Sequence, residues 1–227
     1  ERPEIANLPL FAQMDVEQRD RIFDAAFLQV FPPQLTLFEV GGKADFLHVL
    51  VDGMVELYTR NGKRETSMAI LRPVRSFILA AAYTDQPYLM SARTLTASRI
   101  LLIPAPLLTD MIGKDCGLMR AAMAELAEGF RHFVRTRTDM KLRQSVERLG
   151  NFLLMESRAR GGAVQFDLPV EKRVLASLLG MTPEYLSRAF GALSAHGVLV
   201  TGQVVQILDR AALSDFARPD AFYDDPN

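Results

Sequence analysis

LASLLGMTPEYLSRAFGALSAHG, residues 175–197, has the pattern of two short helices joined by a tight turn. Leucines at helical spacing give the first helix an apolar face. Gly180 can adopt the backbone conformation that ends a helix and reverses the chain. Thr182 can cap the second helix, and Pro183 suits its first position, where a missing N–H costs nothing. The inward face of the second helix is predicted to consist of Leu186, Phe190 and Leu193.

Glu184, Ser187 and Arg188 lie at i, i+3 and i+4 on a different face of the second helix, which predicts that they point outward. Arg can donate two hydrogen bonds to the O6 and N7 of guanine, Glu can accept one from the N4 amino group of cytosine, and Ser is a small, adaptable contact. A helix N-terminus in the major groove brings such residues to base edges. The pattern indicates a DNA-reading helix. The alternative is that Glu184 merely favours the first helical turn and that Arg188 is a solvated charge.

The sequence on both sides of this segment favours a winged helix-turn-helix. GVLV and VVQILD flank a Thr-Gly-Gln turn and predict a hairpin after the two helices. Residues 141–158 predict a further helix upstream, and VQFDL alternates as a strand does. The tail, with Asp215, Asp220, Asp224 and Asp225, is expected to be poorly ordered.

Residues 29–104 predict an all-β domain. Short β-rich runs are separated by turn signals such as Asp52-Gly53 and Asn61-Gly62, which is typical of a sandwich or small barrel. A helical entry is expected at residues 8–27, where Asp15 can act as the cap.

Residues 116–140 predict one long helix with a heptad seam. Its six apolar seam residues contribute on the order of 10 kcal/mol if fully buried, at ~1.5–3 kcal/mol each. Association costs about 4–15 kcal/mol, so the seam predicts a homodimer. The alternative is a helix packed on its own β domain, which can cover only part of such a length. The arginine in the seam suggests splaying or a partner contact. The seam residues are Met119, Met123, Leu126, Phe130, Phe133, Arg137 and Met140.

A basic run follows the seam. It is interpreted either as a solvated face or as a surface for DNA phosphates. Its members are Arg131, Arg135, Arg137, Lys141, Arg143 and Arg148.

Composition narrows the function classes. The 227 residues are 49% hydrophobic, yet no run approaches the ~18 apolar residues of a membrane span, and no signal peptide is visible. A cytoplasmic protein is expected. The net charge of −1 gives no global sign of nucleic-acid binding. One cysteine excludes an internal disulfide, and three scattered histidines with no His-x-His pair predict no catalytic residues and no metal site. An enzyme on a jelly-roll scaffold is therefore disfavoured.

The order of β domain, heptad helix and winged helix-turn-helix resembles the Crp/Fnr superfamily of bacterial transcription regulators over almost the whole chain. The segment LGMTPEYLSRAF matches the recognition-helix pattern of the superfamily, in which E-x-x-S-R is typical of the Fnr branch. The resemblance implies an α+β fold. Its parts are a cyclic-nucleotide-binding-like β-roll (jelly roll) sensor domain at residues 1–112, a dimerisation helix at 113–140 and a winged helix-turn-helix at 141–227.

The resemblance also implies site residues and partners. Glu184, Ser187 and Arg188 would read a TTGA-like half-site, and a dimer would read its palindrome. The DNA-binding set is completed by Thr182, Lys172 and Arg173. The implied partners are double-stranded DNA, RNA polymerase, a second copy of the chain and a small effector, with no membrane.

The sensor domain departs from the cyclic-nucleotide members. Leu79-Ala80 stands where those members have Gly-Glu, and Met90-Ser91 replaces Arg-Ser. A buried phosphate without a charged donor loses its strongest bonds. Arg93 is near in sequence, but strand alternation does not place it in the same pocket. Cyclic nucleotide binding is disfavoured, and a cyclic-nucleotide-responsive regulator with an unconventional pocket is kept as the alternative. The cysteines of an Fnr-type cluster are absent.

Three segments, RPVRSFILAAAY, PYLMSARTL and LPVEKRVLASLLGMTPE, resemble the nitric-oxide-responsive regulators of denitrification, the NnrR type. That resemblance implies an activator of nitrite and nitric oxide reductase genes that senses through haem, although the residues themselves assign no cofactor. The effector-pocket candidates are Leu79, Ala80, Tyr83, Met90, Ser91 and His132.

Neutral imidazole can ligate haem iron. His132 lies beside the seam, where a ligand site would alter helix pairing directly. His48 can face solvent or the roll interior, and His196 ends the recognition helix, where a cation suits the helix dipole. The alternative for each histidine is a structural or surface role.

Overall fold

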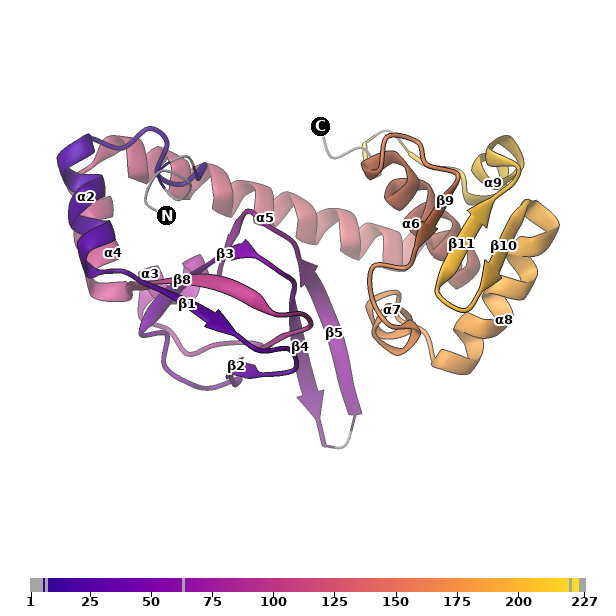
Figure 1. Ribbon diagram of the computed structural model, residues 1–227, viewed down its shortest axis with the longest axis horizontal. Helices are drawn as coiled ribbons and strands as arrows, with labels where there is room; N and C mark the ends of the chain where they lie inside the picture. Colours follow the sequence, from indigo (N-terminus) through magenta and orange to yellow (C-terminus); the bar gives the residue numbers. More distant parts are fainter. Residues whose placement is uncertain (1–5, 7, 63, 221, 225–227) are drawn as a thin grey trace. The chain divides into compact units, whose positions relative to one another are not determined.

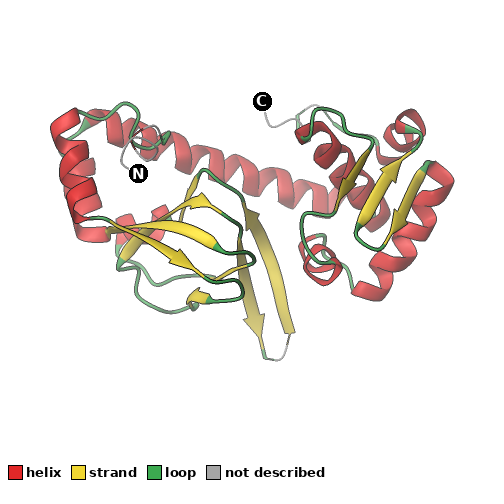
Figure 2. Cartoon of the chain, in the orientation of Figure 1, coloured by secondary structure: helices red, strands yellow, loops and turns green. Residues whose placement is uncertain are grey.

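The computed structural model describes residues 6, 8–62, 64–220 and 222–224. The chain forms two compact units, residues 1–130 and 131–227, and the boundary falls inside the long helix α5 (Cys116–Leu142) (Figure 1). The first unit combines two sheets with several helices, and the second is mainly helical with one small sheet (Figure 2). The predicted α+β fold, with a β domain, a long helix and a helix-turn-helix in that order, is confirmed.

Two four-stranded antiparallel sheets form the β domain. One has the order β1 (Phe27–Phe31), β8 (Ser98–Pro104), β3 (Phe46–Asp52) and β6 (Arg75–Phe77). The other has the order β2 (Thr36–Phe38), β7 (Ser91–Thr94), β4 (Val55–Asn61) and β5 (Arg64–Leu71). Asn61-Gly62 lies in the β4–β5 hairpin, as predicted. The hairpin prediction for Asp52-Gly53 is wrong, because this turn connects β3 to β4 and these strands belong to different sheets. A short helix, α3 (Leu79–Thr84), follows β6 and was not part of the all-β prediction.

Apolar residues of the first unit form two clusters. One lies within the β-roll and includes Leu50, Val55, Leu57, Phe77 and Ile100. The second joins β3 and β8 to the helices α2 (Val16–Ala25), α4 (Ala105–Ile112) and the start of α5. Its fully buried side chains include Phe11, Ile22, Leu47, Ile103, Leu108, Met111 and Leu118. The early part of α5 is therefore anchored on the β domain, as the alternative interpretation of the long helix required.

The predicted helical entry is confirmed as α2. The Asp15 carboxylate accepts hydrogen bonds from the backbone N–H groups of Glu17 and Gln18, at 3.0 and 3.4 Å. Asp15 thus satisfies two donors that the first turn of a helix leaves unpaired.

The segment before α2 is fastened to the start of α5. The buried Asp115 carboxylate accepts from the N–H of Asp15 at 2.9 Å and from the N–H of Leu118 at 2.7 Å. A side chain at Gly117 would collide with the backbone carbonyl of Gln13. The chain around Gln13 therefore lies directly against α5.

The second unit has the predicted order of helix, strand, two helices and hairpin. After α6 (Ser145–Ala159), the strands β9 (Gln165–Asp167), β10 (Val198–Thr201) and β11 (Val204–Ile207) form a sheet in the order β10-β11-β9. The two helices of the turn are α7 (Lys172–Leu178) and α8 (Pro183–Leu193), and a 3-10 turn (Ser194–His196) leads into β10. This arrangement confirms the winged helix-turn-helix prediction.

The expectation of a poorly ordered tail is wrong for the described residues. Helix α9 (Arg210–Ala217) buries Leu213 and Ala217 and lies against α6. Asp224 is buried and accepts two hydrogen bonds from the Arg143 guanidinium, at 2.6 and 2.7 Å. Sequence alone missed this partner because the two residues are 81 positions apart. Asp225 lies outside the described residues.

His48 lies in the interior of the β-roll, which decides between its two predicted orientations. It is 6% exposed, and its ring lies 5.0 Å from that of Phe38 and 5.2 Å from that of Phe77, between centroids. Burial lowers the pKa of His48 to about 4, because the charged imidazolium loses its hydration. His48 is therefore a neutral core residue at neutral pH.

The lowered pKa predicts acid sensitivity of the first unit. Below its ordinary pKa of 6.5, His48 takes up a proton in the unfolded chain but stays neutral in the fold until about pH 4. The unfolded state then binds more protons, so the free energy of unfolding falls as the pH drops through this window, by roughly 3 kcal/mol in all. His48→Phe should remove this loss in denaturant titrations between about pH 7 and pH 4.5.

His196→Asn is the matched control, because it replaces a histidine of the second unit and should keep the acid sensitivity of the first unit. Equal acid sensitivity of wild type and His48→Phe would show that His48 is not the group responsible.

Candidate nucleic-acid interface and sensor domain

The turn between α7 and α8 is formed at Gly180. Its φ is +68°, a conformation that residues with a side chain rarely adopt. A side chain here would also collide with the terminal methyl group of Met140, near the end of α5. Met140, one of the predicted seam residues, therefore packs against the helix-turn-helix itself. Gly180 both reverses the chain and leaves room for that contact.

The N-terminus of α8 is capped as predicted. The Thr182 hydroxyl oxygen accepts a hydrogen bond from the N–H of Tyr185 at 3.2 Å, and Pro183 occupies the first helical position. Leu186, Phe190 and Leu193 are buried, as predicted. The inward face fixes the rotation of α8 about its axis, so its opposite face is presented to solvent.

Glu184, Ser187 and Arg188 are exposed together on α8. Hydrogen bonds from its own backbone N–H and from the Thr182 hydroxyl lower the pKa of Glu184, and the positive charge of Arg188 adds to this shift. The Glu184 carboxylate is therefore ionised and can only accept hydrogen bonds. The Ser187 hydroxyl donates to the Pro183 carbonyl at 3.1 Å, so Ser187 presents acceptor lone pairs to a ligand.

Tyr185 is a residue of this surface that the sequence interpretation missed. The Arg188 guanidinium carbon lies 5.5 Å from the centroid of the Tyr185 ring, which is 39% exposed. This cation–π contact restrains the guanidinium and leaves its N–H donors available. The signal was present in the sequence, because an aromatic residue three positions before an arginine faces it on a helix.

The basic residues of α7 lie at its N-terminal end. The Lys172 ammonium nitrogen is 5.6 Å from the ring centroid of Phe190, so it lies over the junction of α7 and α8. Arg173 is exposed. The structure brings Thr182 and the three exposed residues of α8 together, and it places Lys172 beside the same pair of helices.

Two members of the basic run, Arg143 and Arg148, do not form a solvated or phosphate-binding face. Arg143 donates to Asp139 at 2.7 Å as well as to Asp224, and these bonds raise the pKa of its guanidinium further above its ordinary value. Arg148 is only 6% exposed and donates to the backbone carbonyls of Arg143 and Leu179. Both side chains are internal parts of the second unit.

The predicted seam is exposed along α5. Its apolar residues are between 38% (Leu126) and 67% (Phe130) exposed, and the others in this range are Met119, Met123, Phe133 and Met140. Arg137 is also exposed. Only Leu118 and Ala122 of this helix are buried. In the single chain, this apolar stripe is therefore exposed to water. Exposed apolar patches of this kind are typical of protein–protein interfaces.

The effector-pocket candidates do not share one environment. Leu79 is buried, whereas Ala80 and Tyr83 of α3 are exposed. Met90 is half-buried and packs against the apolar cluster of the roll. The buried Ser91 accepts a hydrogen bond from the N–H of Val40 at 3.0 Å. None of these side chains offers a phosphate a positive charge.

Arg93, the arginine nearest in sequence to Met90-Ser91, pairs with acidic residues of the same unit. Its guanidinium donates to Glu56 at 2.6 Å and to Glu65 at 3.0 Å, and it lies 4.4 Å from the ring centroid of Tyr58. Glu56 is 1% exposed, so this carboxylate depends on Arg93 for its charge balance. The arginine is not available to a bound phosphate.

The three histidines do not form a haem site. His132 is exposed on α5, in a different compact unit from the other pocket candidates. His196 stacks on Phe216 at 4.0 Å between ring centroids, and His48 is enclosed by aromatic rings. Within the described ranges, no three His, Cys, Asp or Glu residues are grouped as metal ligands. The donor set present does not fit haem.

Over the same residues, no helix combines the length and the apolar character that crossing a bilayer requires.

Comparisons with known proteins match both units. Residues 28–115 match the cyclic nucleotide-binding domain family, and residues 147–216 match the Crp-like helix-turn-helix domain family. The anaerobic regulatory protein of Pasteurella multocida (strain Pm70) is 24% identical over 210 residues, which cover 90% of this chain and 76% of that protein.

Solved structures agree with these matches. A proposed cAMP-binding regulatory protein from Silicibacter pomeroyi DSS-3 is 28% identical with a TM-score of 0.62, covering 96% of this chain and 98% of that one. FixK2 from Bradyrhizobium japonicum is 22% identical with a TM-score of 0.73, covering 84% of this chain and 96% of that one. The likeness extends over both units and the helix that joins them.

Proposed function

We propose a DNA-reading mechanism for this chain, which belongs to the Crp/Fnr family of DNA-binding transcription regulators. Members of this family are regulators rather than enzymes. The observation that carries the mechanism is the exposed face of α8, where an ionised Glu184, an acceptor at Ser187 and the Arg188 guanidinium stacked on Tyr185 lie within one turn. In the major groove, Arg188 pairs with guanine and Glu184 accepts from cytosine.

The half-site that fits these contacts is TTGA-like, as the Fnr-branch pattern E-x-x-S-R implies. Thr182, Lys172 and Arg173 lie at or near helix N-termini and contact phosphates, which position the protein without reading sequence. The regulator acts in the cytoplasm, where it activates transcription through contact with RNA polymerase.

Two copies of the chain pair along α5. The exposed seam from Met119 to Met140 supplies the apolar surface for this pairing. A two-fold dimer presents two copies of α8, and it therefore reads a palindrome.

Nitric oxide is the proposed signal, and denitrification genes are the proposed targets. The NnrR-like segments support this assignment, as does the name of the Pasteurella relative, an anaerobic regulatory protein. Haem is not part of the mechanism, because the histidines present do not fit it. The signal shifts the population of helix arrangements, and α5 transmits the shift to α6.

A cyclic nucleotide is a poorer candidate. The Silicibacter structure is named as a proposed cAMP-binding protein, and residues 28–115 match a cyclic nucleotide-binding domain. In this chain, however, Leu79-Ala80 and Met90-Ser91 carry no charge for the phosphate, and Arg93 is bound to Glu56.

Arg188→Ala should abolish specific operator binding and leave the dimer intact. A bidentate arginine–guanine pair is worth about 1–3 kcal/mol, and a dimer makes two, so affinity for a TTGA-palindrome duplex should fall by at least about 30-fold. A mobility-shift titration measures the affinity, and light scattering measures the oligomer.

Arg158→Ala is the control, because Arg158 is an exposed arginine of α6 outside the helix-turn-helix. Operator binding that survives Arg188→Ala, or that falls equally in Arg158→Ala, would contradict the assigned contact.

Phe130→Glu should prevent dimerisation. It places a charge on each side of the pairing axis at the most exposed apolar seam residue, so both the lost apolar contact and the like-charge repulsion oppose association. Sedimentation should show a monomer, and affinity for the palindrome should fall towards that for a single half-site. Leu89→Glu alters an even more exposed apolar residue away from α5 and should leave the dimer unchanged.

Nitric oxide should change operator affinity at least about 5-fold in the purified full chain, the lower end of typical coupling between two sites. The measurement is a mobility-shift titration with and without the gas, in parallel with an absorption spectrum after incubation with haem. The spectrum should show no stoichiometric Soret band. If operator affinity is the same with and without nitric oxide, both in the presence and in the absence of haem, nitric oxide is excluded as the signal. The DNA-reading assignment would not be affected.

A further inference from the structure

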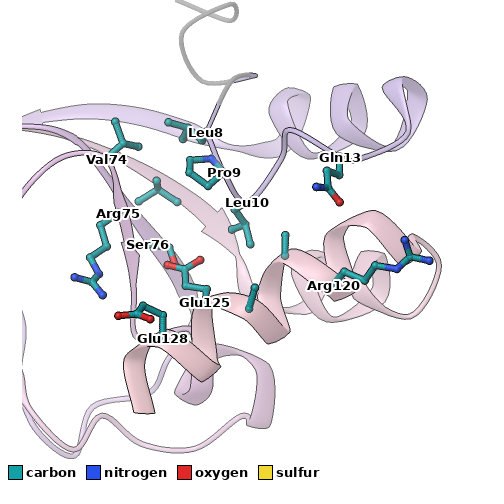
Figure 3. Close-up of a pocket in the computed structure, with 13 residues that line it drawn as sticks. Leu8, Pro9, Leu10, Gln13, Val74, Arg75, Ser76, Arg120, Glu125 and Glu128 are labelled. Carbon is teal, nitrogen blue, oxygen red and sulfur yellow. The ribbon is translucent and has the colours of Figure 1, made fainter. Parts of the chain in front are cut away.

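A cavity of about 480 Å³ lies in the first unit, between the segment before α2, the strands β3 and β6, and helix α5 (Figure 3). Its wall is largely apolar, with side chains such as Leu8, Leu10, Val49, Val74 and Ala124. The volume is within the range of small-molecule pockets, roughly 300–1,000 Å³. The cavity contains none of the effector-pocket candidates, so it is separate from the place where the sequence comparison put the effector.

The cavity is lined by charges of both signs, two arginines and two glutamates. Arg75 comes from β6 and Arg120 from α5, on different walls (Figure 3). Within the described part of the chain, neither guanidinium has a hydrogen-bond or ion-pair partner. Arg75 is half-buried and Arg120 is exposed, so both are free to pair with a ligand.

The carboxylates that line the cavity are already engaged. Glu125 accepts a hydrogen bond from the Ser76 hydroxyl, and Glu128 has an interaction elsewhere in the protein. Both carboxylates keep their negative charge, so the guanidinium groups and the apolar wall are the parts of the cavity that attract an amphipathic anion. Guanidinium recognises carboxylate and phosphate through two parallel hydrogen bonds.

We propose that this cavity binds a small amphipathic anion, an apolar body that carries a carboxylate or a phosphate. The anionic group pairs with Arg75 or Arg120, and the apolar body lies against the aliphatic wall. This chemistry does not identify one natural ligand. The experiment below distinguishes a carboxylate head group from a phosphate head group.

The position of the cavity on α5 makes such a ligand an effector. Arg120, Ala124 and Glu128 line the cavity from α5 at i, i+4 and i+8, whereas the exposed seam follows Met119 and Met123 on another face. A ligand can thus hold α5 against β6 and the N-terminal segment without covering the seam. The regulatory role of the ligand rests on the proposed function. Binding of the ligand to the cavity does not, since it is measured without DNA.

Calorimetry with the full chain tests the proposal. Octanoate and octyl phosphate are the anionic probes, and octanol and octylammonium are the neutral and cationic probes of the same apolar length. At least one anion should bind with one molecule per chain and at least about 10-fold more tightly than octanol or octylammonium. The ratio between the two anions identifies the preferred head group.

Variants assign the binding to this cavity. Arg75→Gln and Arg120→Gln remove one charge each, and at least one should weaken the anion about 10-fold or more, the value of a charged hydrogen bond. Arg64→Gln, an exposed arginine of the same unit outside the cavity, should bind as the wild type does. Ala124→Leu adds volume inside the cavity and should weaken both anions. Thermal unfolding confirms that each variant is folded.

The site is excluded if neither anion binds saturably, if octanol binds as tightly as octanoate, or if both arginine variants bind like Arg64→Gln. Operator binding by the same preparations separates the two proposals. If the protein binds the operator but no anion, only the proposed anion site is contradicted. If it binds an anion but not the operator, only the proposed DNA-reading function is contradicted.

Discussion

A buried guanidinium, that of Arg148, holds the second unit together at the point where α5 enters it. It donates to the Leu179 carbonyl at 3.1 and 3.2 Å, to the Arg143 carbonyl at 2.7 Å and to the Ser145 hydroxyl at 3.1 Å. Removing such a charge from water costs several kcal/mol, which these bonds offset. Because Leu179 precedes the turn at Gly180 and Arg143 follows the last residue of α5, one side chain fixes the end of α5 relative to the helix-turn-helix.

Two further contacts at this junction act in the same direction. Met140 packs against Gly180, and Arg143 is held between Asp139 of α5 and Asp224 near the chain end. A rotation of the last turn of α5 therefore has to move α7 and α8 or break charged hydrogen bonds worth about 1.5–3 kcal/mol each. Within the second unit, the end of α5 and the helix-turn-helix are therefore held together as one stiff junction.

Local patterns in the sequence predicted the elements well, whereas pairings across long separations escaped them. The Asp15 and Thr182 caps depend on neighbours within a few residues, and both are found where expected. Arg143 and Arg148 looked like surface charges because their partners are distant in sequence or are backbone carbonyls. Every residue has a backbone carbonyl, so a carbonyl acceptor cannot be recognised from the amino-acid type. No sequence pattern could therefore have distinguished these two arginines from their exposed neighbours.

In the β domain, the buried negative charge is balanced by another residue of the same chain. The buried Glu56 needs Arg93, and its bond to that arginine is an internal one that a phosphate would have to break. With Leu79-Ala80 and Met90-Ser91 in place of polar pairs, that part of the roll is filled by packing and by the aromatic cluster around His48. The charge of Glu56 is therefore balanced by a residue of the same chain, and Arg93 serves the fold of the roll.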